Sequence, residues 1–95
     1  MKLIMAAIFD AKSESYGRPM FVRAYGEAER AFKDVVNDGK SDYSLHPEDF
    51  SLFEVGTFED ASGVVVGLSV PRCLGTAVTF KTTDPAQLQL LRGEA

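Results

Sequence analysis

The sequence predicts a small α+β domain, in which an antiparallel sheet of about four strands carries one main helix on one face. Three observations lead to this fold class. The chain has 95 residues, enough for one hydrophobic core but not for two. One segment has the apolar periodicity of a helix, and segments rich in β-branched and aromatic residues lie on both sides of it. We expect residues 1–81 to form this single domain and residues 82–95 to form a flexible or weakly docked tail.

Two strands are predicted before the helix. Residues 2–9 are almost entirely apolar and end at Asp10, which is typical of a strand buried on both faces. After a polar connection, residues 20–25 alternate in a way that predicts a second strand. The aromatic and basic face of that strand consists of Phe21, Arg23 and Tyr25.

The main helix is indicated by one apolar stripe. Its members follow the i, i+3, i+4, i+7, i+8 spacing of a helix face, and they are Ala28, Ala31, Phe32, Val35 and Val36. Gly26 is the expected N-cap. Gly39 is the expected left-handed residue at which the helix ends.

A polar loop, a hairpin and a short last element follow the helix. Pro47 suits the first position of a short helical turn within the loop. Residues 50–58 and 64–70 predict two strands joined by a glycine-containing hairpin loop. We expect the core face of the second of these strands to be Val64, Val66, Leu68 and Val70.

Pro71 is expected to close that strand. Residues 72–81 then fit either a short helix or a fifth strand, and the pattern does not choose between them.

Charge is small overall but unevenly distributed. The chain has ten basic and fourteen acidic residues, for a net charge of −4, which excludes a strongly basic polyanion binder of the histone kind. Residues 1–33 carry six basic and four acidic residues, whereas residues 34–60 carry eight acidic residues and one lysine. The molecule is therefore expected to be electrically two-sided.

The sequence predicts a cytoplasmic protein. No apolar run approaches the roughly 18 residues that a membrane-spanning helix needs. The short apolar stretch after Lys2 lacks the features of a signal peptide. The single cysteine, Cys73, excludes an intramolecular disulfide and fits a reducing compartment.

Nothing in the chain predicts an enzyme. The only histidine, His46, and the only cysteine occur in no recognisable nucleophile motif. The acidic residues match no calcium loop, and no glycine-rich phosphate loop is present. We expect no catalytic residue, no metal and no cofactor.

One constellation suggests binding of single-stranded nucleic acid. Aromatic rings can stack on bases while cations follow the phosphates, and one segment interleaves both: Lys12, Tyr16, Arg18, Phe21, Arg23 and Tyr25. The simpler interpretation is that Phe21 or Tyr25 belongs to the core and the arginines are ordinary surface charges.

An interaction protein is the alternative. Both faces of residues 50–58 carry apolar side chains, a surplus that would suit a homodimer or a partner surface. Such a partner could then be bound through Glu48, Asp49, Phe53 and Glu54.

The run from His46 to Gly63, HPEDFSLFEVGTFEDASG, resembles the small nonstructural protein of gokushoviruses, which are Microviridae, bacteriophages with single-stranded DNA. The resemblance extends over roughly residues 1–81. It implies a protein that acts in the cytoplasm of the infected bacterium, is not built into the virion, and serves single-stranded genome synthesis or DNA binding. It supplies no catalytic residues. Together with the aromatic and basic segment, it makes a non-enzymatic factor of viral replication that binds single-stranded DNA the leading hypothesis. In the alternative, the bound partner is a replication protein of the virus or its host.

Overall fold

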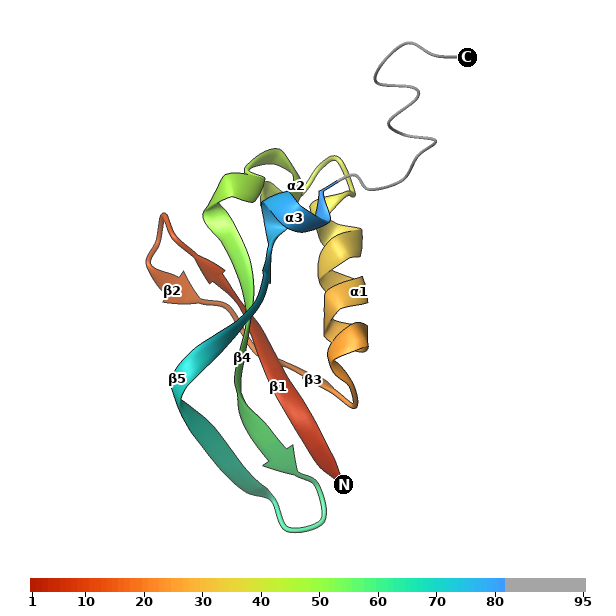
Figure 1. Cartoon of the computed structure of the whole chain (residues 1–95), viewed down its shortest axis with the longest axis vertical. Helices are drawn as coiled ribbons and strands as arrows, with labels where there is room; N and C mark the ends of the chain where they lie inside the picture. Colours follow the sequence, from red (N-terminus) through yellow and green to blue (C-terminus); the bar gives the residue numbers. More distant parts are fainter. Residues whose placement is uncertain (82–95) are drawn as a thin grey trace.

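The structure is a computed structural model that describes residues 1–81. Five strands form one antiparallel sheet (Figure 1). The strands are β1 (Lys2–Asp10), β2 (Ser15–Tyr16), β3 (Met20–Val22), β4 (Phe50–Glu59) and β5 (Val64–Thr76). Their order is β2-β1-β4-β5, and β3 pairs with β1 beside β2. The predicted α+β class is confirmed, and the predicted tail, residues 82–95, lies outside the described residues.

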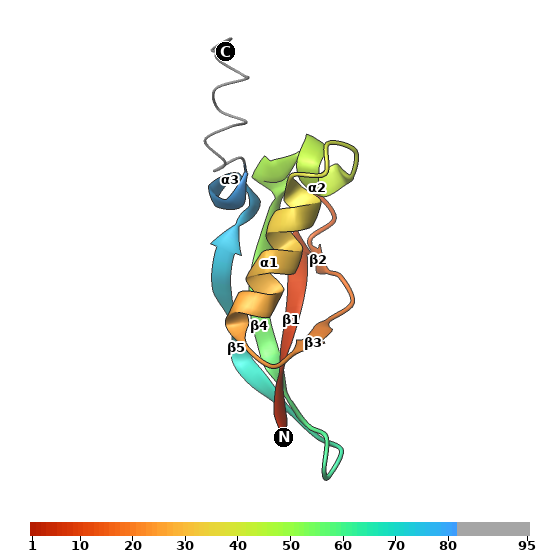
Figure 2. The same cartoon turned by 90° about the vertical axis from the view of Figure 1, so that its right-hand side faces the viewer.

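The helices gather on one face of the sheet. They are α1 (Tyr25–Val36), α2 (Asp42–Leu45), the 3-10 turn η1 (Pro47–Asp49) and α3 (Ala77–Phe80). Figure 2 shows α1 lying in front of the sheet. The predicted stripe is confirmed for Ala28, Phe32 and Val36, which are buried against the sheet, and for Val35, which packs on the core at its edge. Ala31 is exposed, so its assignment to the stripe is wrong: the face that meets the sheet is narrower than the spacing predicted.

The register assigns each side chain of β1 to one face. Ile4, Ala6 and Ile8 belong to the core that α1 covers. Since successive residues of a strand point to opposite faces, Met5 and Phe9 lie on the other face. No helix residue of the core cluster packs there. We call this second surface the open face.

The second strand is shorter than predicted. β3 ends at Val22, and Tyr25 is already the first residue of α1. Phe21 and Tyr25 therefore do not share a strand face. The N-cap is Ala24 and not the predicted Gly26. The helix therefore begins two residues earlier than we expected from the sequence.

The C-terminal end of α1 is close to the prediction. The helix ends at Val36 with Asn37 as its C-cap, and Gly39 has the expected positive φ of 77°. Beyond it, Lys81 donates hydrogen bonds from Nζ to the carbonyl of Val36 at 3.1 Å and to the carbonyl and hydroxyl of Ser44 at 2.9 and 2.8 Å. One lysine thus ties α3 to α1 and α2.

The loop after α1 contains more structure than predicted. Residues 42–45 form α2, whose first turn is capped when the Ser41 hydroxyl accepts a hydrogen bond from the Ser44 amide at 3.3 Å. The sequence offers only four residues here, too few to show a helical period. Pro47 opens η1 as predicted.

The predicted core face of β5 is wrong. Val64, Val66, Leu68 and Val70 are all exposed. The physical reason is length: the 12 residues of α1 span about 18 Å at 1.5 Å per residue, whereas the 13 residues of β5 span about 43 Å at 3.3 Å per residue. In Figure 1 the far end of the β4–β5 hairpin extends beyond the end of α1.

Pro71 does not close β5, which continues to Thr76 before α3 begins. The proline sits in an irregularity, because Glu54 pairs with Arg72 and Gly56 with Gly67, leaving residues 68–71 opposite Val55 alone. A proline is tolerated there because β5 is an edge strand. Residues 72–81 are therefore partly strand and partly helix.

The irregular hairpin predicts opposite effects at two glycines that face each other. A Cβ at Gly56 would lie 2.5 Å from the carbonyl oxygen of Val66 and 3.2 Å from the Cα of Gly67, whereas a Cβ at Gly67 would meet nothing within 4 Å. Gly56→Ala should destabilise the protein by about 1–3 kcal/mol, and Gly67→Ala should leave stability unchanged or slightly higher. Urea unfolding of both variants measures this; equal effects would contradict the described pairing.

Candidate nucleic-acid interface

Three aromatic rings form a cluster on the open face. Phe9 of β1 lies between Tyr16 of β2 and Phe53 of β4, with ring centroids 4.9 and 6.2 Å apart, and the rings of Tyr16 and Phe53 are 5.6 Å apart. The pairing of Phe9 with Tyr16 and of Ala7 with Phe53 brings these strands together. Tyr16 is 43% exposed, so its ring can receive a stacking partner.

A second aromatic pair lies further along the same face. The rings of Phe21 on β3 and Phe58 on β4 are 5.6 Å apart and meet edge to face. Phe21 pairs with Met5, which lies on the open face of β1. Phe21 is 51% exposed. The open face therefore presents two aromatic patches, each with one strongly exposed ring.

Three predicted cations border these patches. Lys12 is in the β1–β2 turn, Arg18 joins β2 to β3, and Arg23 follows β3. All three are exposed. Within residues 1–81, no carboxylate lies within 4.0 Å of any of them. Their charges are thus available to an anionic ligand at the β2/β3 edge of the sheet.

Tyr25 lies elsewhere. As the first residue of α1 it donates its hydroxyl hydrogen bond to Glu54, at 3.2 and 3.3 Å to the two carboxylate oxygens. The Arg72 guanidinium lies 4.9 Å above the Tyr25 ring. The structure therefore places Tyr25 in a contact that joins α1 to the hairpin, apart from Tyr16 and Phe21.

Glu54 is the centre of that contact. Its side chain is only 8% exposed, and Oε1 accepts from Nη2 and Nε of Arg72 at 2.9 and 3.0 Å. Together with the Tyr25 hydroxyl, these donors satisfy a carboxylate that would otherwise be costly to bury. The sequence does not predict a role for Arg72, because its pairing with Glu54 depends on the irregularity at residues 68–71, which a single sequence does not reveal.

The four residues proposed for a protein partner are separated. Phe53 belongs to the aromatic cluster, and Glu54 faces the opposite side of the sheet. Glu48 and Asp49 lie in η1. Glu48 is exposed beside His46, whose Nδ1 is 3.9 Å from its carboxylate, whereas the carbonyl of Asp49 accepts a hydrogen bond from the Ala11 amide at 2.9 Å. These residues do not form one surface.

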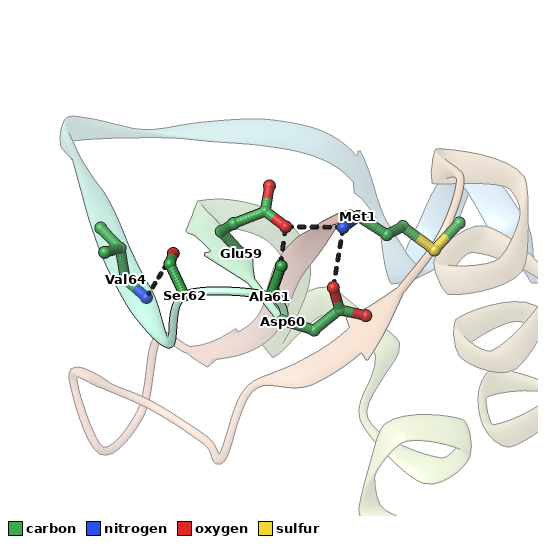
Figure 3. Close-up of polar contacts among 6 residues, drawn as sticks. All are labelled: Met1, Glu59, Asp60, Ala61, Ser62 and Val64. Carbon is green, nitrogen blue, oxygen red and sulfur yellow. Dashed lines mark hydrogen bonds and ion pairs between the residues drawn. The ribbon is translucent and has the colours of Figure 1, made fainter.

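A contact at the hairpin tip fixes Met1, the residue just before β1 (Figure 3). The Met1 ammonium donates to Glu59 at 2.6 Å and to Asp60 at 2.7 Å. Hydrogen bonds to Asp60 and Glu59 raise the pKa of the ammonium, and the same bonds lower the pKa of each carboxyl. The contact is therefore lost when the pH falls through the lowered carboxyl pKa values or rises through the raised pKa of the ammonium.

A groove of about 450 Å³ lies between β2 and α2. Ser13, Ser15, Tyr16 and Tyr43 line it together with two carboxylates, Asp10 and Asp42, and no lysine or arginine of residues 1–81 lines it. It is therefore a poor place for a phosphate. Among residues 1–81, no group of three metal-ligating side chains comes together.

Comparison with known families gives a match over almost all of the described chain. The model of a family described as Phage ORF5 protein matches residues 3–80. The chain belongs to the Phage ORF5 family. No curated protein and no solved structure matches it significantly. In the part of this Phage ORF5 protein that the structure describes, no helix is long and apolar enough to cross a membrane.

The match covers the whole sheet, α1 and both aromatic patches. The match identifies the chain as a phage protein. This agrees with the phage origin that the resemblance in the sequence implies. The family description gives no activity, so the site must be argued from its geometry.

The contact between the buried Glu54 carboxylate and the exposed Arg72 guanidinium can be tested by a double-mutant cycle. Arg72→Met keeps the apolar stem but leaves the Glu54 carboxylate without its cation, and it should cost about 1–3 kcal/mol of stability. Glu54→Gln combined with Arg72→Met should recover part of that loss, because no buried charge remains. Chemical unfolding of the single and double variants measures the coupling, and strictly additive losses would contradict the described contact.

Proposed function

We propose that this Phage ORF5 protein binds single-stranded DNA on the open face of its sheet. The role is non-enzymatic and serves replication of the phage genome in the host cytoplasm, outside the virion. The observation that carries the proposal is the pair of aromatic patches bordered by exposed cations that, within residues 1–81, have no carboxylate partner. Membership of a phage family, and the resemblance of residues 46–63 to the gokushovirus nonstructural protein, support the setting.

The chemistry of the surface suits a single strand better than a duplex. Stacking of a base on an exposed ring contributes about 1–3 kcal/mol, and only an unpaired strand can present its base faces. Tyr16 and Phe21 are the exposed rings, while Phe9, Phe53 and Phe58 support them from beside. Rings recognise every base in the same way, so we expect little sequence preference.

The proposed contacts to phosphates lie along the β2/β3 edge of the sheet. Lys12, Arg18 and Arg23 lie in the turns and connections that flank β2 and β3, next to Tyr16 and Phe21. With three cations on a chain whose net charge is −4, binding should weaken steeply as salt rises, by a slope of about −0.7 per phosphate contact on a log–log plot. Tyr25 is not part of the proposed surface, because it contacts Glu54 on the other side.

Binding should depend on the arginines at the edge and not on charge in general. We expect a labelled oligodeoxythymidine of about 30 nucleotides to bind saturably and more tightly than a duplex of equal length. The Arg18→Ala, Arg23→Ala double variant should lose this binding. The matched control is Arg30→Ala, Lys33→Ala, which removes the same charge from exposed positions of α1.

The aromatic half of the site has its own control. Phe21→Ala should weaken binding about five- to hundredfold, since it removes one stacking ring. Leu45→Ala removes a similarly exposed apolar side chain on α2 and should have no effect. Fluorescence anisotropy at low and at physiological salt measures all variants.

Absence of binding at low salt would refute the proposal. So would equal losses in the two charge variants, because the effect would then be nonspecific. Either result would favour the alternative role of a factor that binds a replication protein.

A further inference from the structure

The two exposed rings of the open face lie in one row beside β1. Tyr16 pairs with Phe9, and Phe21 pairs with Met5. Because β4 pairs with β1 along its whole length on one edge, β2 and β3 share the other edge. The positions of Phe9 and Met5 are four residues apart on β1, which is about 13 Å at 3.3 Å per residue. The two rings that can receive a base are therefore separated by about that distance along the edge.

The cations alternate with the rings along the same edge. The chain runs through β2 and then β3 in one direction beside β1, so its order in the sequence is also its order along the edge. That order is Lys12, Tyr16, Arg18, Phe21 and Arg23, and all five are exposed. A single strand has the same alternation of phosphates and bases, which cations and rings recognise in turn.

We propose that a single strand follows this edge alongside β1, with one base on the Tyr16 ring, a second base on the Phe21 ring and the phosphates between them beside Arg18. This path rests on the proposed function and defines the footprint of its ligand. Gly17, Arg18, Pro19 and Met20 separate the two rings in the chain, so no ring of this connection receives the bases in between.

The spacing of the rings determines how many nucleotides separate the two stacked bases. Stacked bases of one strand are about 3.4 Å apart, so a fully stacked strand covers about 13 Å in about four steps. A nucleotide has twice as many backbone bonds as an amino-acid residue, which makes its extended length about 7 Å. A fully extended strand therefore needs about two steps, and neighbouring bases cannot reach both rings.

Strands with only two bases test this path. Each probe is a DNA strand of about ten nucleotides that is abasic except for two thymines, whose separation is varied while the number of phosphates stays constant. The probes compete with labelled oligodeoxythymidine at low salt. Affinity should rise about fivefold or more from adjacent thymines to a separation of about two to four steps. Beyond this separation it should decline gradually, because the linker is then longer than the span.

Two variants show whether the dependence on separation comes from the rings. Phe21→Leu keeps an apolar side chain but removes the flat ring, so its affinity should not change with the separation of the thymines. Leu45→Ala on α2 is the control and should keep the wild-type profile.

The result that overturns the path differs from the one that overturns DNA binding. A wild-type profile that does not change with separation would refute the path, even if the strand of about 30 nucleotides binds and depends on Arg18 and Arg23. An unchanged profile in folded Phe21→Leu would refute it too. Absence of binding by the long strand would refute the proposed function and the path together.

Discussion

The structure depends on the contact between one short helix and one face of a much longer sheet. Phe32 and Val36 of α1 pack with Ala6 and Leu52 to form the centre of the core, and α2 and α3 extend the cover at one end. Because α1 is shorter than the strands beneath it, burial is one-sided and incomplete. The open face and the far half of the hairpin are exposed as direct consequences. Ala6, Ala28 and Leu52 are fully buried, so the close contact between α1 and the sheet is centred on these small and branched side chains.

The sequence was a good guide where a local rule decides the structure. The α1 stripe, the hairpin and the turn at Pro47 follow from periodicity and turn chemistry. It was a poor guide where tertiary context decides. Alternating valines in β5 have the pattern of a core face, yet no element lies over them. Tyr25 continues the alternation of β3, but the chain turns into α1 before it. Pro71 usually ends a strand, but here it is accommodated in the irregularity of an edge strand.

Of the candidate site, Tyr16 and Phe21 were identified from their residue types. Phe9, Phe53 and Phe58 join them only through strand pairing, which a single sequence does not reveal.

The two exposed surfaces differ in chemistry and therefore in the partners they suit. The open face combines stacking rings with exposed cations at its edge, which fits a single-stranded polyanion. Residues 64–67 of β5 carry no charge, and within residues 1–81 no strand pairs with their outer edge. Glu54 lies on the helical face of β4, where its contacts with Arg72 and Tyr25 hold α1 against the irregular hairpin, whereas Phe53 lies on the open face of the same strand. Replacing residues on one surface should therefore leave the other intact.

In the proposed complex, DNA contacts the open face of the sheet and not the helical face. A ¹H–¹⁵N NMR titration of the labelled protein with oligodeoxythymidine at low salt tests this. We expect amide shifts to change around Phe9, Tyr16 and Phe21, while the exposed side of α1 around Arg30 and Lys33 stays unchanged. Changes centred on α1, or no changes at saturating oligonucleotide, would contradict it.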